Sequence, residues 1–368
     1  MAEYNNTGSD TRKVLMKGNE AVGEAAIKAG CLCYFAYPIT PQTETPEYLS
    51  RRMEEENLIF LQAESEIAAI NMVFGASAAG VRVMTSSSSP GISLKQEGIS
   101  YIAGAELPCV IINVVRGGPG LGNIEASQAD YFQSTRGGGH GDYRCIVLAP
   151  NSVQECYDMT INAFDLADYY RIPVIIQNDG IIGQLVEPFE MHPYKPMFEK
   201  LPPKNWALTG CAGREPNVVR TLYLKPPDGL EQLNRKLDER YKRIQAELRW
   251  VELFNCDKAE LIIIAYGATS RIAKSAIKKH NNNGKKIGMF RPKTLWPWPD
   301  VELVEIARKN KGVKFLVIEM STGQMLEDVL LSLMDVVPKK GILFYGMGGG
   351  WNPTPDMIYE KIAEVLAE

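Results

Sequence analysis

The sequence has few of the residues that build metal centres. Three histidines occur among 368 residues, and none stands at metal-ligand spacing from another. The seven cysteines are scattered and form no C-x-x-C pair. Because iron–sulfur clusters and structural zinc ions need grouped Cys or His ligands, we expect no metal site in this chain. Redox or metal chemistry would have to come from another chain.

Long apolar runs and a charge excess are absent too. No apolar run approaches the roughly 18–20 residues that cross a bilayer, and the initial MAEYNNTGSDTRK is polar where a secretory signal is apolar. The 40 Lys and Arg against 44 Asp and Glu give a net charge of -4, without a basic stripe for a polyanion. We therefore expect a folded cytoplasmic protein whose main partner is neither a membrane nor a nucleic acid.

Short apolar runs alternate with helical patterns along the chain. This alternation predicts βαβ units around mainly parallel sheets, which is the α/β class. The first helix is expected to start at the N-cap Asn19 and to end at Gly30. Further helices are predicted over 65–80, 91–105 and 152–170. Strands are predicted over 32–37, 58–62, 81–86, 108–115, 145–150 and 172–178.

A proline-rich stretch separates these elements from a second, smaller α/β unit. Eight prolines between residues 185 and 227 indicate an extended segment rather than a packed layer. Apolar residues at steps of three and four from Leu230 to Val251 predict a long amphipathic inter-domain helix. We therefore expect domains over 1–227 and 257–368, joined by a linker helix over 228–256. In the second domain, strands followed by helices are predicted over 261–267, 286–290, 314–320 and 341–346.

The helix predicted over 65–80 begins with two acidic residues. Its inner face is expected to consist of small residues, which permit close packing. A carboxylate at the start of the helix, Glu64 or Glu66, would then be partly desolvated. The small residues are Ala68, Ala69, Gly75, Ala76, Ala79 and Gly80.

A hydroxyl-rich turn, TSSSSPG over residues 85–91, joins the next strand to its helix. The plain interpretation is a helix N-cap followed by Pro90, since Ser is a preferred cap and Pro a preferred first-turn residue. The alternative is a turn whose hydroxyls bind a ligand.

Two further segments follow strands at the edge where open α/β sheets bind ligands. Arg116 leaves the strand over 108–115 and enters Gly-Gly-Pro-Gly. Arg can grip a carboxylate with paired hydrogen bonds, and a surface ion pair with Asp or Glu is the alternative. In YPITP over 37–41, two prolines stiffen a turn that aims the Thr40 hydroxyl, although taken alone this is simply a rigid turn.

Together, these four segments resemble the alpha subunit of the 2-oxoacid:ferredoxin oxidoreductases, and the resemblance covers essentially the whole chain. YPITP looks like the family's signature, and QAESEIAAINMVFGASAAG resembles the helix that carries the thiamine-activating glutamate. SSSSPG over 86–91 is similar to the family's T-S-G-P-G turn, with Ser89 in place of the glycine. VIINVVRGGPG resembles the strand whose arginine binds the substrate carboxylate.

The resemblance implies a fold and a set of site residues. A pyrimidine-type thiamine diphosphate domain with a proline-rich extension would span 1–227, and a transketolase C-terminal-like domain would span 257–368. In such enzymes the acid lies nine residues before the helix glycine, as Glu66 does before Gly75 and Glu64 does not. Glu66 would then be catalytic, and Thr40 and Arg116 would bind the substrate. The implied cofactor-binding residues are Pro38, Ile39, Glu66, Ser88, Ser89 and Pro90.

The resemblance also implies partners. The family's magnesium–diphosphate motif G-D-G…N is missing, and its nearest match is Asn178-Asp179-Gly180. A beta subunit would therefore share the thiamine diphosphate and hold Mg2+ and [4Fe-4S] clusters, alongside gamma and ferredoxin-like delta subunits. The implied reaction is the coenzyme A-dependent oxidative decarboxylation of a 2-oxoacid, with ferredoxin as the electron acceptor.

Alternatives stay open for the substrate and for the role of the chain. MKGNEAVGEAAIKAGC, TSSSSPGISLKQEGISYIAGAELP and RGGPGLGN look most like the branched-chain, 2-oxoisovalerate type, and the 2-oxoglutarate type is the near competitor. A second substrate carboxylate needs another cation, which the partner subunit, Arg136 or Arg144 could supply. A non-catalytic scaffold subunit would be expected to have lost Glu66, Arg116 or Thr40. A stand-alone thiamine-dependent decarboxylase or synthase would need the diphosphate motif in the same chain.

Overall fold

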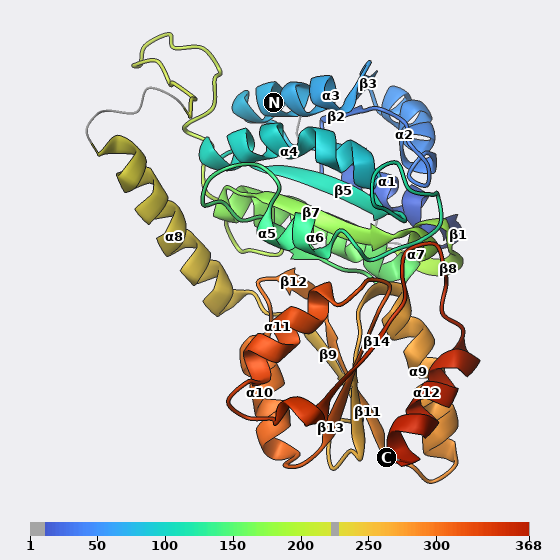
Figure 1. Ribbon diagram of the computed structural model, residues 1–368. Helices are drawn as coiled ribbons and strands as arrows, with labels where there is room; N and C mark the ends of the chain where they lie inside the picture. Colours follow the sequence, from blue (N-terminus) through green and yellow to red (C-terminus); the bar gives the residue numbers. More distant parts are fainter. Residues whose placement is uncertain (1–11, 222–227, 368) are drawn as a thin grey trace.

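The computed structural model describes residues 12–221 and 228–367, and Figure 1 shows two α/β bodies, one above the other. The upper body contains residues 12–221 and a seven-stranded sheet. The lower body contains residues 251–367, apart from one strand, and a five-stranded sheet. The predicted α/β class is thereby confirmed. A separate antiparallel pair joins β1 (Arg12–Lys17) to β8 (Val186–Met191).

The upper sheet has the strand order β12-β6-β7-β5-β4-β2-β3. All neighbouring strands are parallel except β12, which pairs antiparallel with β6. Apart from the edge strand β3, these strands are buried, as a sheet covered by helices requires, and the predicted strands are confirmed. Most are apolar runs, whereas β4 and β7 end in polar residues. The strands are β2 (Cys33–Ala36), β3 (Ile59–Gln62), β4 (Val83–Ser87), β5 (Cys109–Val115), β6 (Ile146–Leu148), β7 (Pro173–Asp179) and β12 (Thr294–Trp296).

Helices cover both faces of the upper sheet. Helices α3 and α4 pack against each other on one face, and α1 packs against α2 and α6 on the other. This division follows from right-handed crossovers, since the connections through α3 and α4 run along the sheet in the opposite direction to the connection through α6. The helices are α1 (Gly18–Lys28), α2 (Glu44–Glu55), α3 (Glu66–Ala78), α4 (Ser89–Gly104), α5 (Tyr131–Arg136), α6 (Val153–Tyr170) and α7 (Gly180–Gln184).

The start of α1 differs from the prediction. The expected N-cap, Asn19, lies inside the helix, and the cap position is Lys17, whose N–H donates to the Glu20 carboxylate at 3.0 Å. The Asn19 side chain is fully buried, and its Nδ2 donates to the Pro41 carbonyl at 2.7 Å and to Glu44 Oε2 at 2.9 Å. Asn19 therefore anchors the turn after β2, because the Pro41 carbonyl in that turn and Glu44 at the start of α2 accept its hydrogen bonds.

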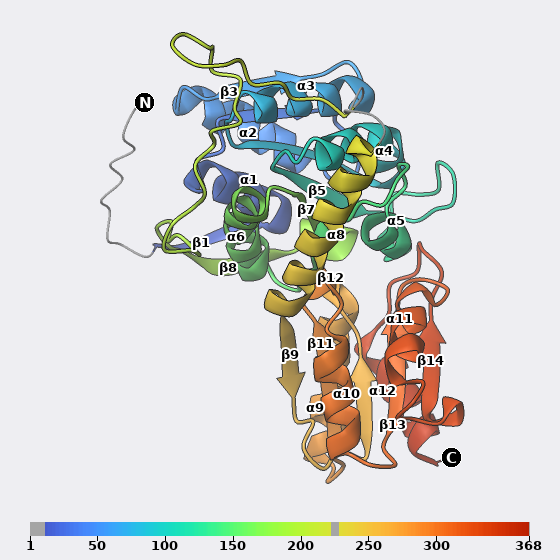
Figure 2. The same ribbon diagram turned by 90° about the vertical axis from the view of Figure 1, so that its left-hand side faces the viewer.

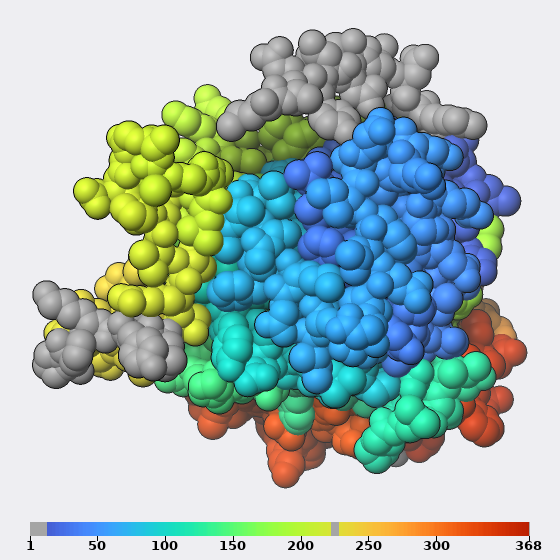
Figure 3. Space-filling view, turned by 90° about the horizontal axis from the view of Figure 1, so that it is seen from above, coloured from blue at the N-terminus to red at the C-terminus, as the bar shows by residue number. Residues whose placement is uncertain are grey.

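The proline-rich segment is extended but anchored to the upper body. It begins with β8, which the sequence did not predict, and its later part lies beside α3 in the view from above (Figure 3). Phe198 stacks on Tyr169 with ring centroids 3.9 Å apart, and the Leu208 N–H donates to the Ala78 carbonyl at 2.8 Å. The end of the segment, residues 222–227, lies outside the described residues.

Helix α8 (Gly229–Glu247) runs from the upper body toward the lower one (Figure 2). Its buried residues Leu237, Tyr241 and Ile244 lie on one face, as the spacing predicted. The helix ends earlier than the predicted residue 256, because β9 (Val251–Phe254) pairs antiparallel with a strand of the lower sheet. Backbone pairing at that sheet edge outweighs the helical periodicity. No helix in the described ranges has the length and apolar character needed to cross a bilayer.

The lower sheet has the strand order β14-β13-β10-β11-β9, with only β9 antiparallel. Helices α9 (Gly267–Asn282) and α12 (Pro355–Ala367) pack on one face, and α10 (Asp300–Lys309) and α11 (Gln324–Leu333) pack on the other. Helix α9 begins before the predicted Ser270. The parallel strands, all predicted, are β10 (Leu261–Ile264), β11 (Ile287–Pro292), β13 (Lys314–Glu319) and β14 (Ile342–Gly346).

The two bodies are joined by more than a linker. Strand β12 follows the lower body's β11 in sequence yet completes the upper sheet. The expected domain boundaries stay a prediction. The Gln128 N–H of the upper body donates to the Met320 carbonyl at 2.8 Å, and its Nε2 donates to the Tyr266 carbonyl at 3.0 Å. The lower body thereby holds the loop that follows β5.

Candidate functional site

The predicted segments meet at one edge of the upper sheet. Strands β2, β4 and β5 are parallel neighbours, so the turns that follow them lie at the same edge. Those turns contain Thr40, Ser89 and Arg116. The Arg116 Nη1 donates to the Thr40 carbonyl at 2.9 Å, and the Arg116 backbone N–H donates to Ser89 Oγ at 3.0 Å. The structure thus brings together the three residues that the sequence singled out on separate turns.

The Arg116 side chain is buried and held by backbone oxygens. It is 7% exposed, and besides the Thr40 carbonyl it binds the Leu121 carbonyl through Nη2 at 2.9 Å. Its buried Nε has no hydrogen-bond partner among the described residues. Neutral carbonyls therefore orient the positive charge without neutralising it. Arg116 forms no ion pair with an Asp or Glu of residues 12–221 and 228–367, and an anion at this edge would meet a pre-oriented guanidinium.

The turn over 37–41 is rigid. The Gln42 N–H donates to the Ile39 carbonyl at 3.0 Å, and the Gln42 side chain is fully buried. Pro38 and Ile39 are half-buried, whereas Thr40 is exposed. The contact with Arg116 uses the Thr40 carbonyl rather than the hydroxyl that the sequence singled out. The turn over 37–41 is therefore a fixed turn and also a part of the edge that holds Arg116.

Helix α3 begins at Glu66, and Ser65 caps it by accepting a hydrogen bond from the Ala68 N–H at 3.2 Å. A carboxylate in the first turn is favoured by the helix dipole. The Glu66 residue is 6% exposed, whereas Glu64 is exposed. Burial therefore distinguishes the two acids in the same way as their spacing from Gly75 does.

The first turn of α4 passes directly over the Glu66 carboxylate. An ideal Cβ built on Gly91 would lie 2.6 Å from Glu66 Oε1 and 2.0 Å from Ser87 Oγ. One built on Gly98, two turns later, would lie 2.5 Å from Ile70 Cγ2. Side chains at either position would force α3 and α4 apart, so the close crossing depends on these two glycines.

The small-residue face predicted for α3 is wrong in phase. The prediction counted Gly75 and Ala79, which are exposed. A period of 3.6 residues that starts at the buried Glu66 selects a different stripe, and the close approach comes from glycines of α4 instead. The buried residues of α3 are Glu66, Ala69, Ile70, Val73, Ser77 and Ala78.

The hydroxyl-rich turn starts a helix and also leaves polar groups without partners. Helix α4 begins at Ser89 with Pro90 in its first turn, so the N-cap interpretation is right in position. Ser88 makes no capping hydrogen bond, and the fully buried Ser87 and Ser88 hydroxyls have no partner within the described residues. Unpaired buried hydroxyls are costly unless a ligand or water bonds them, which favours a ligand-binding turn as well.

Sequence reasoning missed Lys95. The spacing from Ile92 placed it on the buried face of α4, which was the available signal. Lys95 is fully buried, and its Nζ donates to Thr85 Oγ1 at 2.5 Å and to the Ser86 carbonyl at 3.2 Å. Burial lowers the pKa of Lys95 to about 7, and the negative charge of Glu66 opposes this shift.

A glycine-rich loop of the lower body contacts the loop over residues 116–128, which we call the arginine loop. Sequence reasoning missed this contact as well. The Gly350 N–H donates to the Ala126 carbonyl at 3.3 Å. An ideal Cβ on Gly349 would lie 2.8 Å from Gly117 Cα, so the two backbones approach too closely for a side chain. The run of glycines over 348–350 was the sequence signal for this contact.

The near match to the metal motif is a helix cap between the bodies. The Asp179 carboxylate accepts hydrogen bonds from the Ile182 N–H at 3.1 Å and from the Ala268 N–H at 2.7 Å. Burial raises the pKa of Asp179 to about 6, and these hydrogen bonds oppose the shift. Within residues 12–221 and 228–367, no three His, Cys, Asp or Glu side chains are grouped to hold a metal ion.

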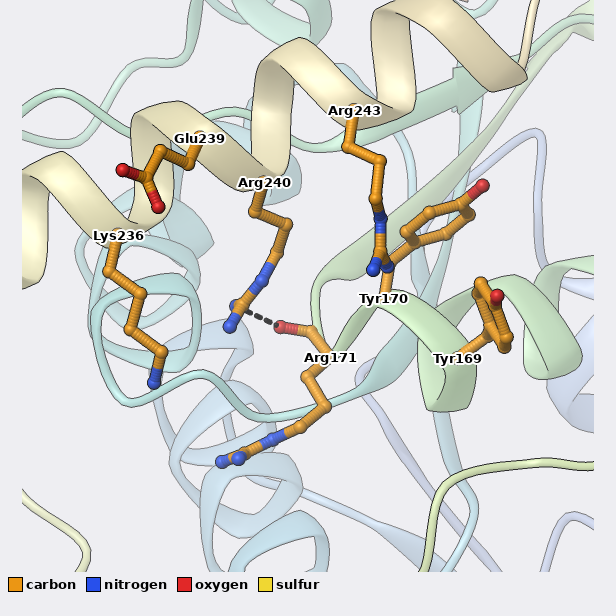
Figure 4. Close-up of a pocket in the computed structure, with 7 residues that line it drawn as sticks. All are labelled: Tyr169, Tyr170, Arg171, Lys236, Glu239, Arg240 and Arg243. Atoms are coloured by element: carbon orange, nitrogen blue, oxygen red, sulfur yellow. Dashed lines mark hydrogen bonds between the residues drawn. The ribbon is translucent and has the colours of Figure 1, made fainter.

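A hollow between α6 and α8 contains none of the predicted site residues (Figure 4). The Glu106 carboxylate pairs with Lys236 at 2.7 Å and with Arg240. The Arg240 Nη1 also donates to the Arg171 carbonyl at 3.1 Å. These contacts hold α8 against the upper body, so we interpret the hollow as a gap left where α8 packs on that body rather than as a ligand site.

Comparison with known protein families matches both bodies. Residues 24–246 match the family described as pyruvate flavodoxin/ferredoxin oxidoreductase, thiamine diP-bdg, and residues 259–358 match pyruvate:ferredoxin oxidoreductase core domain II. The ketoisovalerate oxidoreductase subunit VorB of Methanothermobacter marburgensis is 48% identical over 357 residues, covering 96% of this chain and 98% of that protein. The 2-oxoglutarate synthase subunit KorA of Methanothermobacter thermautotrophicus is 36% identical over 366 residues, covering 90% and 95%.

Solved structures show the same fold. A 2-oxoglutarate:ferredoxin oxidoreductase from Magnetococcus marinus, with 2-oxoglutarate, coenzyme A and succinyl-CoA bound, matches with a TM-score of 0.83 at 30% identity. The match covers 96% of this chain and 65% of that chain, so this chain spans about two thirds of it. An inactive split-gene transketolase tetramer, at a TM-score of 0.57 and 14% identity, shows the fold alone. The expected thiamine-binding α/β domain with a second α/β domain is thereby confirmed.

Replacing Gly91 tests the packing over the carboxylate. Gly91→Ala is expected to destabilise the chain by about 1–3 kcal/mol, because its Cβ would overlap Ser87 and Glu66. Gly75→Ala, in the open on α3, is the matched control and should stabilise the helix by about 0.5–1 kcal/mol. Urea unfolding followed by circular dichroism measures both free energies. Equal stabilisation by both alanines would contradict the close crossing of α3 and α4.

Proposed function

The chain belongs to the 2-oxoacid:ferredoxin oxidoreductase family, and from this membership we propose that it is the alpha subunit of a thiamine-dependent enzyme. The reaction would convert a 2-oxoacid and coenzyme A into an acyl-CoA and CO2, while the electrons released reduce ferredoxin. The observation that carries the proposal is the convergence of Glu66, Arg116 and the Thr40 turn around the start of α4.

The residues at this edge fit the pyrimidine end of thiamine diphosphate. Glu66 is a carboxylate shielded from water, and Gly91, which lies against it, has no side chain to cover it. The buried Ser87 and Ser88 hydroxyls would gain partners from a polar heterocycle. When bound, thiamine supplies a nucleophilic carbon and an electron sink for the decarboxylation of a 2-oxoacid.

We assign the acid role to Glu66. Its carboxylate would hydrogen-bond the pyrimidine N1′ and hold a proton at that atom, in a site where little water competes. The residues that would line the ring come from two turns, and they are Pro38, Ile39, Ser88, Ser89 and Pro90. Retention of a buried Glu66 together with Arg116 argues against a scaffold subunit whose site has decayed.

We assign substrate binding to Arg116 and Thr40. The carbonyls of Thr40 and Leu121 hold the guanidinium in one orientation, and its buried Nε has no hydrogen-bond partner among the described residues. The remaining N–H groups would bind the substrate carboxylate. Thr40 is exposed on the same turn, and its hydroxyl would bond the carboxylate or the 2-oxo group. Orientation before binding lowers the entropic cost of forming the reactive complex.

A beta subunit would complete the site. The turns and helices around it expose large apolar side chains, with exposed fractions between 39% and 78%. Apolar residues gathered around a polar site are typical of a surface that another protein covers. We propose that the beta subunit covers this rim and holds the diphosphate, Mg2+ and iron–sulfur clusters, with gamma and ferredoxin-like delta subunits completing the complex. The rim residues are Tyr37, Ile67, Leu94, Leu121 and Ile124.

For the substrate we propose a branched-chain 2-oxoacid such as 2-oxoisovalerate. The relative that is 48% identical is named a ketoisovalerate oxidoreductase subunit. Residues 117–124, which follow the substrate arginine, carry no charge. Arg136, which could hold a second carboxylate, pairs instead with Asp328 at 2.7 Å, and Arg144 donates to the Thr135 carbonyl at 3.4 Å. The competing candidate is 2-oxoglutarate, which the names of the 36% identical relative and the solved structure favour.

Substitution of Glu66 tests the acid role. Glu66→Gln should leave the complex assembled but lower turnover by about 100- to 10,000-fold, because an amide cannot share a proton with the ring nitrogen. Glu64→Gln, at the exposed acid of the same segment, is the control and should retain most activity. Steady-state reduction of ferredoxin by the reconstituted complex measures both. Near-normal turnover of Glu66→Gln would remove the basis of the assignment.

Substrate choice is tested by comparing 2-oxoisovalerate, pyruvate and 2-oxoglutarate with coenzyme A and ferredoxin present. We expect the highest kcat/KM for 2-oxoisovalerate, because a second buried carboxylate would lack a cation from this chain. Arg136→Gln and Arg144→Gln should then leave the ranking unchanged. A higher kcat/KM for 2-oxoglutarate that depends on either arginine would show that the substrate is the dicarboxylate.

A further inference from the structure

The arginine loop folds back on itself beside the substrate arginine. The Gly117 N–H donates to the Glu125 carbonyl at 2.8 Å, and the Asn123 N–H donates to the Gly117 carbonyl at 2.9 Å. The Asn123 Oδ1 also accepts a hydrogen bond from the Glu125 N–H at 3.2 Å. Asn123 therefore closes the turn whose Leu121 carbonyl binds the Arg116 guanidinium at 2.9 Å.

The Asn123 side chain contacts glycines of both bodies. An ideal Cβ on Gly117 would lie 2.4 Å from Asn123 Oδ1, and one on Gly350 would lie 2.4 Å from Asn123 Nδ2. One on Gly349 would lie 2.8 Å from Gly117 Cα and 2.8 Å from Ser127 Oγ. Side chains at these positions would force the two loops apart, so the contact depends on the three glycines.

The lower body holds its own loop in place. The loop between β14 and α12 reaches the upper body (Figure 1), and at its start the Met347 N–H donates to the Glu319 carbonyl at 3.0 Å. Glu319 is 0% exposed at the end of β13, and its carboxylate accepts hydrogen bonds from two backbone N–H groups at the start of α11. The loop that contacts Asn123 is therefore attached to the core of the lower sheet.

We propose that Gly349, Gly350 and Asn123 are positioning residues through which the lower body orients the substrate arginine and sets the KM for the 2-oxoacid. The inference rests on the proposed function of Arg116. The three residues act through the arginine loop, whose Leu121 carbonyl holds the guanidinium. Paired hydrogen bonds from an arginine to a carboxylate need one geometry, so a displaced guanidinium binds the substrate more weakly.

This role predicts an effect on KM rather than on kcat. In the proposed reaction the substrate carboxylate loses its charge as CO2 leaves. Arg116 therefore contributes at least as much to substrate binding as to the stability of the transition state. Loss of such binding raises KM and leaves kcat nearly unchanged, whereas a general loss of folded enzyme lowers the apparent kcat at an unchanged KM.

The direct test replaces glycines of the lower-body loop in the reconstituted complex. Gly349→Ala should raise the KM for the 2-oxoacid that the complex turns over fastest by about 10-fold or more, because its methyl group would displace Gly117. The kcat should change by less than about twofold. Gly348→Ala is the matched control, since no atom lies within 4 Å of an ideal Cβ there, and it should leave both constants unchanged. Steady-state reduction of ferredoxin measures both constants.

Hydrogen exchange in the cofactor-free full chain gives a second readout that needs no turnover. In Gly349→Ala, the backbone amides over 117–126 should exchange about 10-fold faster than in the wild type, because the bonds that close the arginine loop open more often. The amides of α4 should keep their wild-type rates, since that helix belongs to the acid half of the site. Gly348→Ala should give the wild-type pattern throughout.

Asn123 gives an independent test from the upper body. Because this residue is exposed, Asn123→Ala should fold, and it should raise the KM as Gly349→Ala does. Gly350→Ala would overlap the Asn123 amide, and the overlap disappears when residue 123 is alanine. The two substitutions together should therefore raise the KM by less than the product of their separate effects.

An unchanged KM in folded Gly349→Ala and Asn123→Ala complexes overturns the proposal, and so does a fall in kcat without a rise in KM. If the Gly349→Ala complex does not assemble, Asn123→Ala decides the matter. Failure of the proposed function gives a different result. In that case Arg116→Gln leaves the KM unchanged, although exchange over 117–126 still rises in Gly349→Ala.

Discussion

The first turn of α4 lies directly on the Glu66 carboxylate, and the other parts of the site follow from that contact. Because Gly91 has no Cβ, the turn approaches the carboxylate more closely than any side chain would permit. The same turn carries Ser89, which receives the Arg116 backbone N–H at 3.0 Å and so fixes the end of β5. The first turn of α4 thereby holds both the Glu66 carboxylate and Arg116 at the same edge of the sheet.

The arginine half of the site also depends on the lower body. Gln128, at the end of the arginine loop, is bound to the Met320 and Tyr266 carbonyls, and Gly349 approaches Gly117 backbone to backbone. The acid half is built from α3, α4 and β4 of the upper body. The two halves thus have separate supports, while the apolar rim around them faces outward, where a partner subunit would dock.

Buried parallel strands could be predicted because they are continuous apolar runs, and the site turns could be predicted because they follow those strands. Strands β1, β8, β9 and β12 could not, since they are short or polar and exist only through partners distant in sequence. The face of α3 was assigned in the wrong phase because Gly75 was taken as a packing residue, although it is exposed. Lys95 was overlooked because a lysine in a helix is ordinarily solvent-exposed. Asn19 was predicted to be a helix cap because the groups that it bonds, the Pro41 carbonyl and the Glu44 carboxylate, lie far away in the sequence.

We propose that this chain forms only one half of a cofactor site, because its sequence offers Glu66 and Arg116 but no G-D-G…N motif for a diphosphate. The most direct measurement is calorimetric titration of thiamine diphosphate and Mg2+ into the full chain alone and into the chain assembled with its beta subunit. We expect weak or undetectable binding to the chain alone and stoichiometric, magnesium-dependent binding to the assembly. Tight, stoichiometric, magnesium-dependent binding to the chain alone would contradict it.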